Sequence, residues 1–282
     1  MYDWFMDTGI RVVSIIAVAV IMFFIFGYLI PKLIGRFMSR RMAGEADTEI
    51  KKRTDTLSSI LVTIMGVILL IVAILTILPE FGVNIATLIA AIGVGGLAIA
   101  FAAQNLVRDF ITGFFILFED QYRVGDVVTI AGISGGVEEV TLRRTILRDL
   151  DGKVHSIPNG KVETSTNQTK KFSRVNLNVS VGYGENLDTV IETINRICHD
   201  MVEDPKWKGD FISTPTVLRV DNLGDSGIDI KILGDTKPAR QWDVTGELRL
   251  RIKKAFDSEG IEIPWPHTKV YFGNTPTISS KN

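Results

Sequence analysis

The chain has 282 residues, of which 46% are apolar, and its formal net charge at pH 7 is −1. A mean hydropathy of +0.24 is high for a water-soluble protein, and the length leaves room for two or more domains. The balanced charge offers no basic surface for nucleic acid, so we expect no nucleic-acid partner.

Three stretches of the chain carry no charge, at 12–31, 57–79 and 81–107. Each is long enough to cross about 30 Å of hydrocarbon. The first lacks the small-residue cleavage site of a signal peptide and is followed by further apolar stretches, which favours an uncleaved helix. We therefore predict a transmembrane domain over 1–118, with helices at about 9–31, 57–79 and 81–118.

Basic residues are distributed unevenly around these stretches. Segment 32–55 holds seven Lys or Arg residues, whereas Arg11 is the only base ahead of the first stretch and the turn at 79–84 has none. Basic loops stay in the cytoplasm. The pattern predicts an inner (cell) membrane protein with its N-terminus outside, a cytoplasmic loop at 32–55 and a cytoplasmic C-terminal part.

The cluster Lys51, Lys52 and Arg53 stands directly ahead of the second stretch. Basic residues in this position attract anionic lipid headgroups, but they are also the ordinary topology signal. Both readings stay open. The single Cys198 cannot form an internal disulfide, which fits a reducing compartment.

The third stretch is too long for a straight crossing. Apolar character continues to Phe118, and 38 residues of helix measure roughly 57 Å, almost twice the hydrocarbon thickness. We predict a bend near 104–105, where small apolar residues give way to Gln104 and Asn105.

Beyond the bend, one helical face is polar. It carries Asn105, Arg108, Asp109 and Thr112, with phenylalanines elsewhere. This pattern is typical of a helix lying along the membrane interface. The alternative is a helix end that enters the water-exposed domain.

Glycine and alanine make up ten of the twenty residues from 86 to 105. Small residues allow helix backbones to approach closely inside a bilayer. On a helical wheel, two small-residue ridges flank one narrow face. The narrow face holds Leu97 and Phe101, with Ala90, Val94 and Gln104; the flanks hold the predicted packing residues Gly93, Gly95, Gly96, Ala98, Ala100 and Ala102.

A helix with two small flanks can take an identical neighbour on each side. Contacts of this heterologous kind close a ring, and the narrow face would then point toward the axis. Rings of large apolar side chains stop ions by expelling water from a pore, so Leu97 and Phe101 are the candidate constriction. The alternative is that both residues simply pack in a helical bundle.

The remainder of the chain predicts two water-exposed domains. Residues 119–174 contain short alternating strands, at 127–130 and 137–142, and glycine turns, which indicate a small β-barrel or sandwich. Residues 175–274 show a β-α-β-β-α-β order, which predicts a ferredoxin-like α/β domain. Its predicted strands lie at 175–181, 216–221, 227–233 and 268–272, its helices at 187–202 and 240–258, and a loose tail at 275–282 follows.

Catalytic and cofactor sites are not expected. His155, His199 and His267 lack metal-ligand spacing, and no Ser or Cys has a plausible base. The glycine run at 93–96 lies inside an apolar helix rather than after a strand, which excludes a dinucleotide site. A secondary transporter would need ionisable residues or repeats in its spans, and a membrane-anchored sensor would not need two small flanks.

Several motifs resemble the small-conductance mechanosensitive channel family. They are the run from Gly96 to Gln104, Gly113 and the apolar residues after it, Arg-Val-Gly-Asp at 123–126, and Ile-Pro-Asn-Gly at 157–160. Similarity extends over about 57–272. The resemblance implies a homoheptamer that membrane tension opens and that releases ions and small solutes on hypo-osmotic shock, with membrane lipids as its other partners.

The resemblance also assigns roles along the third helix. The two constricting rings fall on Leu97 and Phe101, the membrane-proximal kink on Asn105, and a second flexible glycine on Gly113. It implies a cytoplasmic vestibule with side portals, closed by a barrel of C-terminal strands. Two positions depart from the family pattern, since the second ring is often Leu and the kink residue is Gly.

Overall fold

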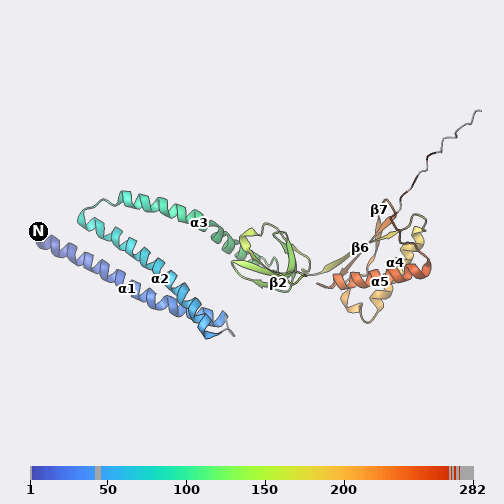
Figure 1. Cartoon of the computed structure of the whole chain (residues 1–282), viewed down its shortest axis with the longest axis horizontal. Helices are drawn as coiled ribbons and strands as arrows, with labels where there is room; N and C mark the ends of the chain where they lie inside the picture. Colours follow the sequence, from blue (N-terminus) through green and yellow to red (C-terminus); the bar gives the residue numbers. More distant parts are fainter. Residues whose placement is uncertain (1, 42–45, 267, 269, 271–272, 274–282) are drawn as a thin grey trace, which may run out of the picture. The chain divides into compact units, whose positions relative to one another are not determined.

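The computed structural model describes residues 2–41, 46–266, 268, 270 and 273. The chain divides into two compact units, Met1–Ala102 and Ala103–Asn282. Figure 1 shows the order of helices and strands along both units. Each unit is described separately below.

The first unit is built on two long helices, α1 (Tyr2–Arg41) and α2 (Asp47–Ile77), which pack against each other. Gly66 permits one of the closest contacts, because a β-carbon there would stand 2.9 Å from the ring of Phe23. The short helix η1 (Leu78–Phe81) follows and ends at Gly82, which has a left-handed φ of 77°. The Asn84 side chain then accepts a hydrogen bond of 2.9 Å from the Ala86 amide, which starts α3 (Ala86–Phe118).

The helix bounds differ from the prediction at two places. Most of the predicted 32–55 loop is helical, because Lys, Arg and Glu are good helix formers and pairs such as Arg53–Glu49, at 2.6 Å, support the turns. The charges therefore do not mark the end of the helix. The third helix begins at Ala86 instead of 81, since Pro79 and Gly82 interrupt the chain before it. The bend near 104–105 stays a prediction.

All three helices are long and apolar enough to span a membrane.

The second unit begins with the end of α3 and a five-stranded antiparallel sheet. The strands are β1 (Val127–Ile130), β2 (Ile133–Val140), β3 (Arg144–Arg148), β4 (Val154–Pro158) and β5 (Ser165–Asn167), in the order β4-β3-β2-β1-β5. The one-turn helix η2 (Asn159–Lys161) follows β4. The core of this β domain includes Ile116 of α3 together with Val128, Ile130 and Leu147.

The α/β domain completes the second unit. Its three antiparallel strands are β6 (Ser173–Val181), β7 (Thr216–Leu223) and β8 (Ile228–Thr236), in the order β6-β8-β7. Helices α4 (Leu187–Glu203) and α5 (Gln241–Glu259) bury Ile194, Leu248 and Phe256 in one core with the strands. This is the strand order that a ferredoxin-like domain requires of its first three strands. The predicted closing strand at 268–272 lies mostly outside the described residues, and the predicted tail at 275–282 lies wholly outside them.

Candidate pore helix and its support

The first half of α3 is an apolar helix on which no other described part of the subunit packs. Every residue from 86 to 102 is exposed, including Leu97 at 60% and Phe101 at 75%. Gly93, Gly95 and Gly96 have no heavy atom within 4 Å of the place where a β-carbon would stand. An uncharged surface of this kind requires acyl chains or other apolar helices around it.

The predicted pore and packing residues therefore all lie on one exposed helix, and within the subunit they form no enclosed site. Ala90, Val94, Leu97 and Phe101 are exposed on it, as are Gln104 and Asn105 beyond it. The packing residues Ala98, Ala100 and Ala102 are also exposed. Their roles as pore, packing and hinge residues stay predictions. Lys51, Lys52 and Arg53 are exposed near the start of α2, where lipid contact likewise stays a prediction.

The second half of α3 packs on the β domain. Asp109 is 8% exposed, and Gly113 and Ile116 are buried on the same face. The Asp109 carboxylate accepts a hydrogen bond of 2.9 Å from the Gly160 amide. Asp109 of the predicted polar face thus binds the β domain, and whether this half of α3 also lies along the membrane interface stays a prediction.

Gly113 has a role that the sequence did not indicate. A β-carbon there would overlap the carbonyl group of Leu142 and the side-chain amide of Asn159. Gly113 therefore allows close approach of the helix to the turn between β2 and β3. Only glycine leaves room for Leu142 and Asn159 at this position, whether or not the helix also bends there.

A buried hydrogen-bond chain holds that turn in place. The Asn159 amide donates to the Thr141 carbonyl at 2.8 Å, and its oxygen accepts from the Thr145 hydroxyl at 2.9 Å. The Tyr122 hydroxyl lies 3.0 Å from the same Thr145 oxygen. Burial raises the pKa of Tyr122, and the hydrogen bond with Thr145 opposes that rise. The chain stays neutral and fixes the surface on which α3 rests.

The end of α3 is held by charged residues. Asp120 has a left-handed φ of 53°, and Arg123 donates to both of its carboxylate oxygens, at 2.5 and 2.8 Å. This hydrogen bonding by Arg123 lowers the pKa of Asp120. Asp126 accepts from the Arg123 amide and from Asn167 of β5, so the Arg-Val-Gly-Asp motif closes the junction of helix and sheet.

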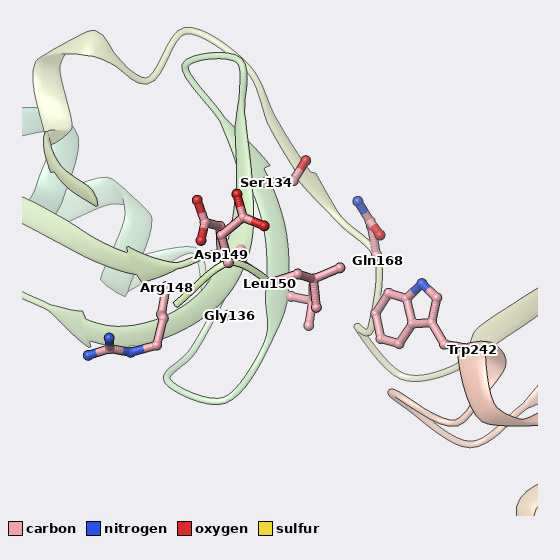
Figure 2. A pocket seen from close by; sticks show the side chains of 10 residues that line it. Ser134, Gly136, Arg148, Asp149, Leu150, Gln168 and Trp242 are labelled. Atoms are coloured by element: carbon pink, nitrogen blue, oxygen red, sulfur yellow. The ribbon is translucent and has the colours of Figure 1, made fainter. Parts of the chain in front are cut away.

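The second unit also contains a cavity of about 720 Å³. Figure 2 shows Leu150, Gln168 and Trp242 around the open space, with the charged side chains to one side. Those charges are already engaged, since Arg148 binds Glu138 and Asp149 binds His155 at 2.8 Å.

The described residues hold no group of three metal-ligating side chains. Burial also raises the pKa of the one cysteine, Cys198, to about 12, which keeps its thiol protonated. Neither the cavity nor this thiol has the geometry of a catalytic site.

Comparison with known proteins gives the same family along most of the chain. Family models described as mechanosensitive ion channel transmembrane helices 2/3, beta-domain and MscS C-terminal match residues 63–104, 105–170 and 175–263. A small-conductance mechanosensitive channel of Caldanaerobacter subterraneus is 40% identical over 80% of this chain and 79% of its own length. An uncharacterized MscS family protein of Archaeoglobus fulgidus is 34% identical over 94% of this chain and 89% of its own.

A solved structure shows the same fold. The crystal structure of Helicobacter pylori MscS in its closed state matches with a TM-score of 0.66 and 24% identity, over 93% of this chain and 99% of that one. Together with the three spanning helices, these matches show that the chain belongs to the MscS family and is a small-conductance mechanosensitive channel, a membrane protein and not an enzyme.

Proposed function

We propose that copies of this chain form a ring in the cell membrane, in which the first half of α3 lines the pore and Leu97 and Phe101 close it. The observation that carries the proposal is the bare apolar surface of residues 86–102. Nothing in the described part of the subunit covers this helix, so neighbouring copies and lipid must do so. The family resemblance favours seven copies, with the N-terminus outside and the second unit in the cytoplasm.

The two small flanks support close packing on both sides of each helix. Gly93, Gly96 and Ala100 form one flank, and Gly95, Ala98 and Ala102 form the other. Because these residues have little or no side chain, neighbouring backbones can come into van der Waals contact. The same smooth flanks let helices slide and tilt with small steric barriers.

The gate follows from the narrow face between the flanks. In the closed state, rings of Leu97 and Phe101 form a dry constriction that excludes ions without any charge. Membrane tension does work equal to the tension multiplied by the gain in in-plane area. The wide state is favoured when this work exceeds the difference in packing free energy, and ions and small solutes then leave the cell after hypo-osmotic shock.

The attachment of α3 to the β domain defines which part of the helix moves. Asp109, Gly113 and Ile116 are buried where α3 packs on the β domain, whereas residues 86–102 have no buried position. The bend at 104–105 then lies between a fixed and a movable part. Asn105, which tolerates unusual backbone angles less well than Gly, sets how readily the helix bends on closing.

Patch recordings of the gate variants test the proposal. Leu97→Ser and Phe101→Ser place a hydroxyl in the constriction, so we expect a lower opening tension and slower growth of cells that express either variant. Ile99→Ser is the matched control, because it removes similar apolar bulk from the opposite side of the same helix. Wild-type thresholds for both gate variants, or an equal change for Ile99→Ser, would refute the assignment of the gate.

A further inference from the structure

One ion pair joins two different helices of the first unit. Arg11 Nη1 of α1 lies 3.5 Å from Glu80 Oε2 of η1, and 24% of the Glu80 side chain is exposed. The Arg53–Glu49 pair of the same unit lies within one helix, so it supports α2 alone. The Arg11–Glu80 pair instead connects parts of the chain that are far apart in the sequence.

Both members of the pair are isolated charges in the sequence. Glu80 is the only charged residue from 56 to 107, and Arg11 is the only basic residue ahead of the first apolar stretch. A charge in so apolar a segment is costly unless a partner lies near it. Thr8, one turn before Arg11 on the same side of α1, is 8% exposed, so this side of α1 is packed.

A short, hydrogen-bonded turn leads from Glu80 to the first residue of α3. Pro79 has a fixed φ, and its carbonyl accepts a hydrogen bond of 2.9 Å from the Gly82 amide. The Asn84 side chain accepts from the Ala86 amide. These constraints leave the turn little freedom, so a displacement of Glu80 is passed on to the start of α3.

The turn is also the main connection between the first half of α3 and the other two helices of the subunit. Every residue from 86 to 102 is exposed, so little side-chain packing ties this half of α3 to α1 or α2. Force that α1 and α2 receive from lipid therefore reaches α3 through the turn before Ala86 or, in a ring, through neighbouring copies.

We propose that the Arg11–Glu80 ion pair holds the turn to α1, so that α3 follows when membrane tension moves α1, and that salt on the outer side of the membrane weakens this coupling. The inference rests on the proposed function, which places both residues on the outer side and the pore on α3. Arg11 and Glu80 are positioning residues, since neither belongs to the proposed constriction. Without the pair, α1 and α2 can move while the turn lags behind, and more tension is needed to open the pore.

External ionic strength controls the pair because both side chains are partly exposed. The Debye length grows from about 3 Å at 1 M salt to about 30 Å at 0.01 M, so a dilute medium strengthens the attraction. Hypo-osmotic shock is a dilution of this kind. The pair thus couples α1 to α3 most firmly at the moment when the channel must open.

Patch recordings of the full-length channel test this inference. We expect Arg11→Gln and Glu80→Gln to open at a higher tension than the wild type. An exposed ion pair changes an equilibrium by about twofold, and the copies in a ring multiply this effect. The open probability at the wild-type midpoint tension should therefore fall at least about tenfold.

Two further variants separate the pair from a general loss of structure. The double variant Arg11→Glu/Glu80→Arg restores the pair with reversed charges, so its midpoint tension should return toward the wild-type value. Glu49→Gln is the matched control, because it breaks a pair inside one helix, and it should leave the midpoint unchanged. Wild-type midpoints in both single variants, or no recovery in the double variant, would overturn the inference.

External salt gives a second measurement on the same channels. Dilution of the outer solution from about 1 M to about 0.01 M, with sucrose keeping the osmolarity constant, should lower the midpoint tension of the wild type and leave that of Glu80→Gln unaltered. An equal response in both channels, or a response only to dilution on the cytoplasmic side, contradicts the proposed role of the pair. The pore assignment is judged separately by the Leu97→Ser and Phe101→Ser thresholds, so either idea can fail alone.

Discussion

Gly113 of α3 lies so close to the main chain of Leu142 that a methyl group on its α-carbon would stand 2.6 Å from the Leu142 carbonyl carbon. The contact joins α3 to the turn between β2 and β3 through backbone atoms. Backbone atoms cannot rotate away as a flexible side chain can, so the glycine is required for the fit.

Replacing Gly113 with alanine should therefore destabilise the protein. The gain in helix propensity is about 1 kcal/mol, but a methyl group forced into a tight contact costs about 1–3 kcal/mol. Gly246→Ala in α5 is the matched control, because a β-carbon there meets nothing within 4 Å, and we expect it to stabilise by about 1 kcal/mol. Denaturant unfolding of both variants gives the comparison, and a gain of stability in Gly113→Ala would leave only the flexible-hinge role.

The Asp109–Gly160 hydrogen bond should be needed for coupling between α3 and the β domain. Hydrogen bonds to charged groups contribute about 1.5–3 kcal/mol, so Asp109→Ala should lower the free energy of unfolding by roughly this amount and change the rate of channel closing. Asp109→Asn keeps an oxygen acceptor and should retain most of both properties. Equal losses in the two variants would mean that the charge, and not the hydrogen bond, matters.

The turn between β1 and β2 offers a stabilising substitution. Ala131 has a φ of 48° and Gly132 one of 76°, and Ile130 pairs with Ile133 across them, as in a two-residue hairpin with positive φ at both positions. Alanine in this conformation costs about 1 kcal/mol or more, and Asn is accepted there more readily. Ala131→Asn should raise the melting temperature, while Gly132→Ala should lower it.

The α/β domain should have a lower free energy of unfolding in acid than at neutral pH. Hydrogen bonds from Arg240 hold the pKa of Asp210 below its usual range, and Arg251 does the same for Asp204. A carboxyl with a lowered pKa in the folded state stabilises above its unfolded pKa of about 4 and loses that contribution as the pH falls through the folded value. Unfolding free energies should thus decline below about pH 4, and Arg240→Gln should make the decline shallower.

Sequence patterns predicted the secondary structure of the water-exposed unit well, because its signals are local. Alternating apolar residues define β6 and β8, and the apolar face of α4 begins directly after the Asn186 cap. The ends of the three long apolar helices were harder to predict from the sequence. Charged residues such as Lys51 interrupt the apolar pattern but favour helix, so the end of an apolar stretch does not give the end of the helix.

Long-range contacts explain what the sequence could not show about the site. Asp109 and Gly160 are 51 positions apart, and no local pattern pairs them. The one available signal was a lone acid in an apolar helix, which requires a partner when buried. Gly113 looked like a flexible position because the surface against which it packs comes from Leu142 and Asn159, farther along the chain.

Substitutions in the exposed half of α3 should affect a different property of this protein than substitutions where α3 packs on the β domain. Because residues 86–102 carry no buried position in the subunit, substitutions there should cost the isolated subunit little stability and act on the proposed ring instead. In the proposed ring, the width of the pore can therefore change between related channels without loss of subunit folding. Substitutions at Gly113 or Asn159 have the opposite effect, since they damage the subunit before any ring can assemble.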